Sequence, residues 1–256
     1  MSDVTDPIFR VAELERFFEH VAGSYVCGTL REHPKDCGVI LRRDVDLEVA
    51  AAHRMSLLEE KYGLRASYLI MTTNHAYNPA SPQNRALLRD MVARGFDIGL
   101  HFDPFVYGDV SDAEIQRHAE DEAAFLTAAC GASVTSVSIH NPSFHGKYPM
   151  LQRFVNAYSP ALFEPDRYWS DSLMRPRKDL WSFVTAASER LLQVLMHPFH
   201  YTPDGAGYRE LFVGNIRDYA NALDAQFRPA NARYRDAFPE PIQDTAIRSD
   251  FGVPFA

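Results

Sequence analysis

The fold of this chain is decided by residues 38–46, which read Gly38-Val39-Ile40-Leu41-Arg42-Arg43-Asp44-Val45-Asp46. An apolar run opens the stretch and predicts a buried strand. Two aspartates close it, and side chains two residues apart in a strand point to the same side. The stretch therefore predicts a buried strand that carries two carboxylates, Asp44 and Asp46, on one face of its carboxyl end.

The rest of the chain repeats this plan. Apolar runs of strand length alternate with stretches of helical periodicity, which is typical of a parallel sheet covered by helices. Further strands are expected at residues 65–71, 96–102, 134–139 and 191–196, with shorter candidates at 155–158 and 168–171. Helices are expected at residues 11–20, 47–62, 82–94, from 111 to near 131, and near 208–223. The predicted fold class is α/β, in the form of a barrel.

Polar side chains follow one predicted strand after another. They are Asp44 and Asp46, Asn74 and His75, His101 and Asp103, His140, Asp171, and His197. In parallel α/β folds the carboxyl ends of the strands face one common mouth, where functional sites are built. We therefore expect these side chains to contribute to a single site.

Composition narrows the class of protein. The chain has 256 residues, enough for one barrel, and a net charge of -8 without a marked Lys/Arg cluster, which argues against a nucleic-acid partner. The three cysteines, Cys27, Cys37 and Cys130, are odd in number and widely spread, which suits a reducing compartment. No signal peptide and no apolar stretch of transmembrane length is visible in the sequence, so we expect a cytoplasmic location.

The Asp-x-Asp pair indicates a metal site. Two carboxylates held this close repel each other unless a cation or a shared proton lies between them. A divalent metal on one of them leaves the other free to act as a base. Asp46, which directly precedes the helix expected at residues 47–62, could instead cap that helix. The residues alone leave both interpretations open.

Histidines at strand ends extend this chemistry. His101 and His140 are candidate metal ligands, although a lone histidine beside apolar residues is more often a packed core residue. His197 ends an apolar strand and could serve as a general acid oriented by Asp171, or could merely bond the chain around Pro198. The sequence has no Gly-x-Ser-x-Gly elbow, Walker loop or Gly-x-Gly-x-x-Gly stretch, which argues against nucleophilic-serine and nucleotide chemistry.

These elements, in this order, resemble the polysaccharide deacetylase superfamily (NodB-type, carbohydrate esterase family 4). The likeness is closest to a branch associated with bacterial surface-polysaccharide, or O-antigen, biosynthesis. Residues 41–46 resemble that branch's Arg-His-Asp-Val-Asp element, with Arg43 in place of the usual His. The other matching stretches are residues 98–103, 138–143, 156–159, 170–172 and 195–198.

The resemblance, which runs from about residue 38 to residue 201, implies a distorted (β/α) barrel. We expect the chain to be one such domain over residues 1–256, with an N-terminal helical extension at 1–30 and a loosely ordered tail at 238–256. The resemblance also implies a divalent metal, usually zinc, bound by one Asp and two His. Carried over by position, Asp46 and His101 are metal ligands and Asp44 is the general base. His197 is the general acid, and Asp171 is its partner.

Two positions depart from the family's pattern. The second His of the second element is Phe105 here, so the third ligand must come from elsewhere: His140 ranks first, Asp103 second and His75 third. The Arg that contacts the base in the third element is Asn141 here. Asn141 and Asn74 join Asp103 and His75 as candidates for contacting substrate.

The function expected from these residues is metal-dependent hydrolysis of an N-acetyl or related amide group on a sugar, in cytoplasmic surface-polysaccharide biosynthesis. The substrate would be a small sugar, a nucleotide-sugar or a lipid-linked saccharide. The main alternative is a catalytically degenerate barrel that binds a saccharide or a partner protein without hydrolysis. A third option is another metal-dependent barrel hydrolase, acting on a small amide or phosphoester.

Overall fold

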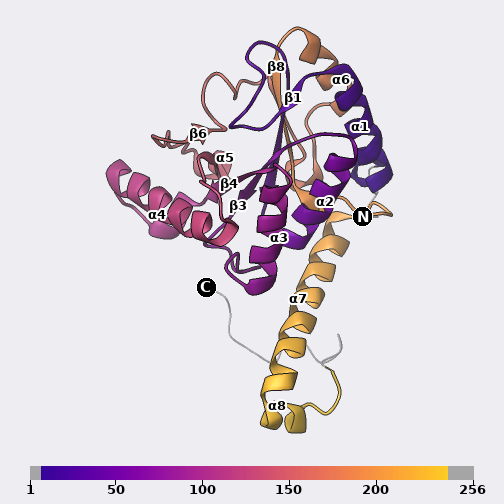
Figure 1. Ribbon diagram of the computed structural model, residues 1–256, viewed down its shortest axis with the longest axis vertical. Helices are drawn as coiled ribbons and strands as arrows, with labels where there is room; N and C mark the ends of the chain where they lie inside the picture. Colours follow the sequence, from indigo (N-terminus) through magenta and orange to yellow (C-terminus); the bar gives the residue numbers. More distant parts are fainter. Residues whose placement is uncertain (1–6, 242–256) are drawn as a thin grey trace. The chain divides into compact units, whose positions relative to one another are not determined.

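A parallel sheet flanked by helices forms the body of the protein (Figure 1). The computed structural model describes residues 7–241, and the chain divides into two compact units between residues 206 and 207. The strands of the first unit are β1 Cys27–Gly28, β2 Gly38–Val45, β3 Ser67–Ile70, β4 Asp97–Phe102, β5 Ser136–Ile139, β6 Val155–Asn156, β7 Tyr168–Ser170 and β8 Leu191–Met196. Its α-helices are α1 Val11–Ser24, α2 Val49–Lys61, α3 Pro82–Ala93, α4 Asp112–Cys130, α5 Pro142–His145 and α6 Leu180–Val184.

The sheet runs in the order β6-β5-β4-β3-β2-β8-β7, and every pair in it is parallel. β1 pairs with the start of β2, alongside the main path. The sheet curls into a half-barrel with helices on its outer side, so the expected α/β architecture of the distorted barrel type is confirmed. Because all strands run the same way, their carboxyl ends lie along one edge.

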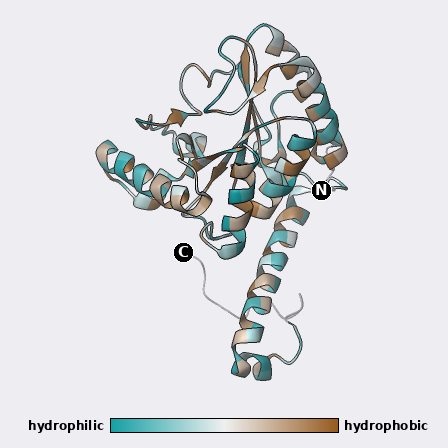
Figure 2. Cartoon of the chain, in the orientation of Figure 1, coloured by the Kyte–Doolittle hydropathy of each residue, from teal (hydrophilic) through white to brown (hydrophobic). Residues whose placement is uncertain are grey.

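The central strand β2 is buried along its whole length, and its two faces meet different surroundings. Val39, Leu41 and Val45 belong to the large apolar core that the helices cover. Ile40 belongs to a smaller apolar cluster of the concave side. Burial on both faces explains why the strand reads as a continuous apolar run, which Figure 2 shows as brown strands within the sheet.

Arg43 points to the helix-covered face of β2. Its Nε donates to Glu59 Oε1 of α2 at 2.9 Å, and Tyr68 of β3 donates its hydroxyl to Glu59 Oε2 at 2.6 Å. All three side chains are fully buried. Burial raises the pKa of Glu59, while the nearby Arg43 charge opposes that rise. Arg43 therefore joins β2, α2 and β3 on the outside of the barrel and takes no part in the strand-end site.

A second buried carboxylate closes the opposite end of the barrel. Ser67, Asp97 and Ser136 are the first residues of β3, β4 and β5. Asp97 Oδ2 accepts hydrogen bonds from Ser67 Oγ at 2.6 Å and from Ser136 Oγ at 2.7 Å. These bonds hold three adjacent strands in register at their amino ends, so the polar groups at the carboxyl ends sit on a fixed frame.

The long elements lie where the sequence predicts them, with ends that differ by up to four residues except in the last long helix, which ends at Ala230 instead of near residue 223. The capping box that opens α4, from Ser111 to Glu114, is present as expected. The short pieces were not predicted: β1, α5, α6 and several 3-10 turns, including η2 Pro104–Tyr107, η3 Ser172–Met174 and η5 Pro198–His200. Such pieces are too short to carry a periodic signal.

The second unit holds α7 Tyr208–Ala230 and α8 Ala232–Ala237. Its helices are joined by Tyr234, which donates to Asp224 Oδ1 at 2.8 Å, and Arg228 also binds Asp224, at 2.9 Å. Residues 242–256 of the tail expected at 238–256 lie outside the described residues. The expectation of one domain over residues 1–256 stays a prediction. No helix among the described residues combines the length and apolarity needed to cross a membrane.

We expect Arg43→Met to lower the free energy of unfolding by about 3–5 kcal/mol, because it leaves Glu59 buried without its cation. Urea denaturation followed by circular dichroism measures this. The matched control is Arg54→Met, which breaks an exposed pair with Glu48 and should cost less than about 1 kcal/mol. A loss for Arg43→Met as small as the control's would contradict the role given to this pair.

Candidate metal centre and proton-transfer site

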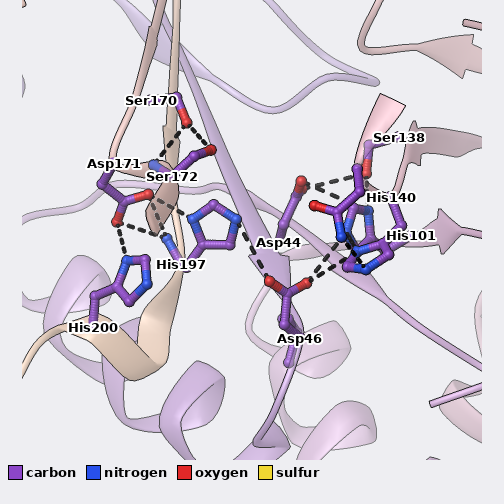
Figure 3. A network of polar contacts seen from close by, with 12 residues as sticks. Asp44, Asp46, His101, Ser138, His140, Ser170, Asp171, Ser172, His197 and His200 are labelled. Carbon is purple, nitrogen blue, oxygen red and sulfur yellow. Dashed lines mark hydrogen bonds and ion pairs between the residues drawn. The ribbon is translucent and has the colours of Figure 1, made fainter. Parts of the chain in front are cut away.

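The two aspartates of the first motif point into the concave side of the sheet (Figure 3). Asp44 lies within β2 and is almost fully buried, and Asp46 follows directly after the strand and is half-buried. α2 begins at Val49, with Glu48 as its N-cap residue. The interpretation of Asp46 as the cap of that helix is therefore wrong, and its carboxylate is available to the site.

Asp46 meets two histidines that arrive from separate strands. His101 comes from β4 and His140 follows β5, and one donor atom of each of the three residues lies within 4.8 Å of the others. His101 Nε2 is 3.2 Å from Asp46 Oδ1, and His140 Nδ1 is 3.7 Å from the same oxygen. The two imidazole rings are nearly perpendicular, with 3.1 Å between His101 Nε2 and His140 Nδ1. A carboxylate oxygen and two ring nitrogens thus converge on one point.

The surrounding hydrogen bonds leave these atoms suited to a cation. Ser138 donates its hydroxyl to Asp44 at 3.3 Å, so it accepts from His101 Nδ1 at 2.6 Å. With its proton on Nδ1, His101 presents a lone pair on Nε2. Asp46 Oδ1 is buried and has no hydrogen-bond partner among the described residues. An orphaned buried carboxylate oxygen beside imidazole lone pairs fits a divalent metal such as zinc.

The protonation states of Asp46 and His140 also suit a divalent metal. Burial raises the pKa of Asp46, but the adjacent imidazoles of His101 and His197 outweigh burial, so the net pKa is well below its usual range. Burial lowers the pKa of His140, and the nearby His101 lowers it further. At neutral pH the carboxylate is ionised and His140 is neutral, which are the forms that bind a metal.

The structure separates the three candidates for the third ligand. His140 lies in the donor group, whereas neither Asp103 nor His75 belongs to any such group among residues 7–241. Asp103 accepts from the backbone N–H of Phe105 at 3.0 Å and caps η2. His75 is exposed. Phe105, at the position of the family's second histidine, stacks on His145 with 3.4 Å between ring centroids.

The two asparagines flank the donor group. Asn74 donates its amide to the backbone oxygen of Asp46 and so helps to position that residue. Asn141 adopts a left-handed conformation, with φ of 44°, and its amide lies 2.8 Å from His140 Nε2. The orientation of this amide decides which nitrogen of His140 carries the proton. A carbonyl oxygen turned towards Nε2 would leave Nδ1 free for a cation.

Asp44 is held by an arginine of its own strand. Arg42 Nε donates to Asp44 Oδ1 at 2.9 Å and its Nη2 donates to Oδ2 at 2.7 Å, a two-pronged pair that is fully buried. Tyr158 and Gln193 also contact the guanidinium, at 3.0 and 3.4 Å. Burial raises the pKa of Asp44, but Arg42 more than offsets this and the net pKa is lowered. Arg42 thus holds both oxygens of the Asp44 carboxylate from the same strand.

Our sequence analysis missed Arg42 as a site residue. The signal was available, because Arg42 and Asp44 are two residues apart and must share a face of the strand. An arginine inside an apolar strand is rare unless it has a buried partner.

On the other side of Asp46 lies a proton-donating group. Asp171, fully buried, accepts from His197 Nδ1 at 2.6 Å and from the His197 backbone N–H at 3.0 Å. Burial lowers the pKa of His197, but Asp171 outweighs burial and raises it to about 9. The other ring nitrogen, Nε2, lies 3.7 Å from Asp46 Oδ2. At neutral pH His197 therefore holds a proton beside the candidate metal ligand (Figure 3).

His200 completes this group and was not among the predicted site residues. It is buried, and its Nδ1 lies 3.0 Å from the second oxygen of Asp171. With one imidazole on each oxygen, the Asp171 carboxylate cannot rotate without breaking a hydrogen bond. The spacing His197-Pro198-Phe199-His200, which one 3-10 turn spans, was the available signal.

A separate cavity of about 400 Å³ is lined by residues of α1 and α6 that include Phe17 and Trp181, together with Met196 and Tyr201. None of the Asp46, His101 and His140 group lines it. Because chemistry requires convergent polar groups, we place the candidate site at the strand ends rather than in this cavity.

Comparison with known proteins gives likenesses of structure only. No protein-family model and no curated protein sequence matches the chain. It is similar to a chitin deacetylase from Colletotrichum lindemuthianum, at 13% identity over 73% of this chain and 85% of the other, with a TM-score of 0.44. It is similar to the peptidoglycan deacetylase PdaC from Bacillus subtilis, at 15% identity over 81% and 100% of the two chains, with a TM-score of 0.43.

A third similar structure is a carbohydrate esterase family 4 pseudoenzyme from Bacillus anthracis, at 14% identity over 73% of this chain, with a TM-score of 0.42. The chain spans just under two thirds of that protein, 63%. Likenesses of this size do not carry a residue's role or an activity to this chain.

We expect Asp46→Ala and His140→Ala each to weaken zinc binding by at least about 100-fold, because losing a ligand should cost more than losing an outer partner. Isothermal titration with Zn²⁺ measures the affinity. His75→Ala and Asp103→Asn should bind zinc like the parent protein. Equal losses for Asp103→Asn and His140→Ala would refute the donor group described above.

Proposed function

We propose that this chain is a metal-dependent hydrolase that removes an N-acetyl or related acyl group from the nitrogen of a sugar. The observation that carries the proposal is that an ionised carboxylate, Asp44, and a protonated imidazole, His197, both lie beside Asp46, with His197 Nε2 3.7 Å from Asp46 Oδ2. Hydrolysis of an amide needs one group to take a proton from water and another to give a proton to the departing amine.

Asp46, His101 and His140 would hold the metal, which is expected to be zinc. When bound, a divalent cation supplies Lewis acidity, which polarises a carbonyl oxygen and makes water more acidic. Among the chain's own groups, Ser138 links His101 to Asp44 by hydrogen bonds of 2.6 and 3.3 Å. The candidate ligand and the candidate base therefore share one hydroxyl, which keeps their separation constant.

Asp44 is suited to accept the proton of an attacking water. Its carboxylate is ionised at neutral pH and almost fully buried, and Arg42 occupies both of its oxygens from the same strand. A base held in this way is oriented before substrate arrives, which lowers the reorganisation needed during the reaction. Arg42 also stabilises the ionised form, so Asp44 acts at neutral pH without first losing a proton.

His197 is suited to return a proton to the leaving nitrogen. Its pKa of about 9 keeps it protonated at neutral pH, and Asp171 and His200 fix the direction in which Nε2 points. An amine leaving group must be protonated to depart, whereas the alcohol that leaves from an ester depends less on protonation by a general acid. The strongly held imidazolium therefore favours an amide over an ester as the bond that is cleaved.

The substrate we propose is a small sugar, nucleotide-sugar or lipid-linked saccharide of bacterial surface-polysaccharide biosynthesis, handled in the cytoplasm. The motif likeness over residues 38–201 and the odd, scattered cysteines support this choice. All three cysteines are free thiols. The alternative is a barrel that binds a saccharide without cleaving it. It is supported by Phe105, which stands where the deacetylase family has its second metal-binding histidine.

The test is release of acetate from N-acetylated sugars by the purified protein loaded with zinc. Asp44→Asn and His197→Ala should each lower kcat/KM by about 10²–10⁴-fold while keeping zinc, because each removes one proton-transfer group and no ligand. His53→Ala, which removes a half-buried histidine of α2 that pairs with Asp90 rather than with the site, should leave kcat/KM unchanged.

Metal content and saccharide binding separate the alternatives. Stoichiometric zinc with acetate release that survives in both Asp44→Asn and His197→Ala would remove the roles proposed for these residues. Sugar binding by parent and variants alike, without acetate release from any of them, would favour the non-catalytic barrel.

A further inference from the structure

A second set of metal donors lies beside the candidate metal centre (Figure 3). It consists of Asp171, His197 and His200, which are all buried, and one donor atom of each lies within 4.8 Å of the others. We call these three residues the second group, and Asp46, His101 and His140 the first group. Both groups offer one carboxylate and two imidazoles, a donor set that binds zinc in proteins. The second group lies entirely within the first unit of the chain.

The turn after β8 places both imidazoles of the second group on one side. His197 precedes η5 and His200 ends it, so the two histidines are three residues apart. Side chains at this spacing lie on the same side of a 3-10 turn, which has three residues per turn. The Nδ1 atoms therefore face one carboxylate, at 2.6 and 3.0 Å from the two Asp171 oxygens. Phe9 and Phe199 pack against the His200 ring, with centroids 5.8 and 4.3 Å away, and keep it in this direction.

A buried hydroxyl beside the second group has no partner. Tyr201 directly follows His200, and burial together with the charge of Asp171 raises the pKa of Tyr201, so its hydroxyl lies close to that carboxylate. The hydroxyl oxygen is buried and has no hydrogen-bond partner among the described residues. Such a group is costly unless it gains a partner. A metal on two imidazoles and one carboxylate keeps a position for a water, which would supply that partner.

The distances between donor atoms rank the two groups. Zinc lies about 2.0–2.2 Å from nitrogen and oxygen ligands, so donors around a tetrahedral ion are about 3.3 Å apart. The first group has distances of 3.1, 3.2 and 3.7 Å between its donor atoms and already matches this spacing. In the second group the ring nitrogens are closer to Asp171, at 2.6 and 3.0 Å. A cation there must separate two hydrogen-bonded pairs, so the second group binds a metal more weakly than the first.

We propose that Asp171, His197 and His200 form a second, weaker site for a divalent transition metal such as zinc, and that metal bound there inhibits the hydrolase. The inhibition rests on the proposed function, whereas the binding does not. A metal on Nδ1 of His197 takes the place of the proton that Asp171 holds there. The ring then keeps one proton, on Nε2, and its loss would leave an imidazolate anion, a far stronger base than neutral imidazole. His197 therefore no longer serves as a general acid.

Metal analysis after equilibrium dialysis against excess zinc tests the binding. The parent protein should hold one zinc more than His200→Gln, which keeps a hydrogen-bond donor for Asp171 but supplies no imidazole. Asp46→Ala with His140→Ala, which removes two donors of the first group, should still hold one zinc. The matched control His75→Gln, an exposed histidine outside both groups, should hold as much zinc as the parent protein.

Two outcomes of this dialysis would overturn the second site. The first is equal zinc content in the parent protein and folded His200→Gln. The second is the absence of bound zinc from Asp46→Ala with His140→Ala, a result that needs no change in the second group. Circular dichroism checks that each variant is folded.

Acetate release tests the inhibition. Raising zinc from one equivalent to saturation of the second site should lower kcat/KM of the parent protein by about 10²-fold or more, because a general acid contributes about 10²–10⁴-fold. The same rise in zinc should leave kcat/KM of His200→Gln at that variant's own starting value. A second zinc that binds without loss of acetate release would overturn the inhibition. Binding of the second zinc by a protein that never releases acetate would support the site and contradict the proposed function.

Discussion

Everything in the candidate site depends on the pairing of Arg42 with Asp44 inside the barrel. An isolated carboxylate buried to this degree would take up a proton, because the low-dielectric interior disfavours its charge. The guanidinium two residues earlier reverses that preference and keeps Asp44 ionised. Arg42 and the protonated His197 together supply two positive charges against the carboxylates of Asp44, Asp46 and Asp171. One negative charge is left over, and a divalent cation beside Asp46 would more than balance it.

Much of this arrangement could be predicted from the sequence, for one geometric reason. Parallel strands end at one edge, so polar residues that directly follow apolar strands must approach one another. From that rule we predicted that Asp46, His101 and His140 meet, although they lie up to 94 positions apart in the chain. Long strands and helices were predictable because their periodic patterns extend over many residues.

The strand-end rule gave a wrong position for residues that lie in a tight turn directly after a strand. Asp103 is two residues after His101 and would share its face in an extended strand. β4 ends at Phe102, however, and Pro104 opens a 3-10 turn that Asp103 caps. The pairing of His200 with Asp171 was not predicted for the same reason, since a turn rather than a strand brings the two together. Turns of three or four residues carry no periodicity, and only the folded contacts show where their side chains point.

Arg42 and Asp44 have a mechanical consequence as well as an electrostatic one. When a carboxylate and its counter-charge sit on neighbouring strands, any sliding of one strand against the other changes the distance between them. Here both groups are carried by β2, an interior strand that pairs with β3 on one side and with β8 on the other. Thermal displacement of β2 moves the two groups as a rigid body. Displacement of the neighbouring strands therefore leaves the distance between the Arg42 guanidinium and the Asp44 carboxylate unchanged.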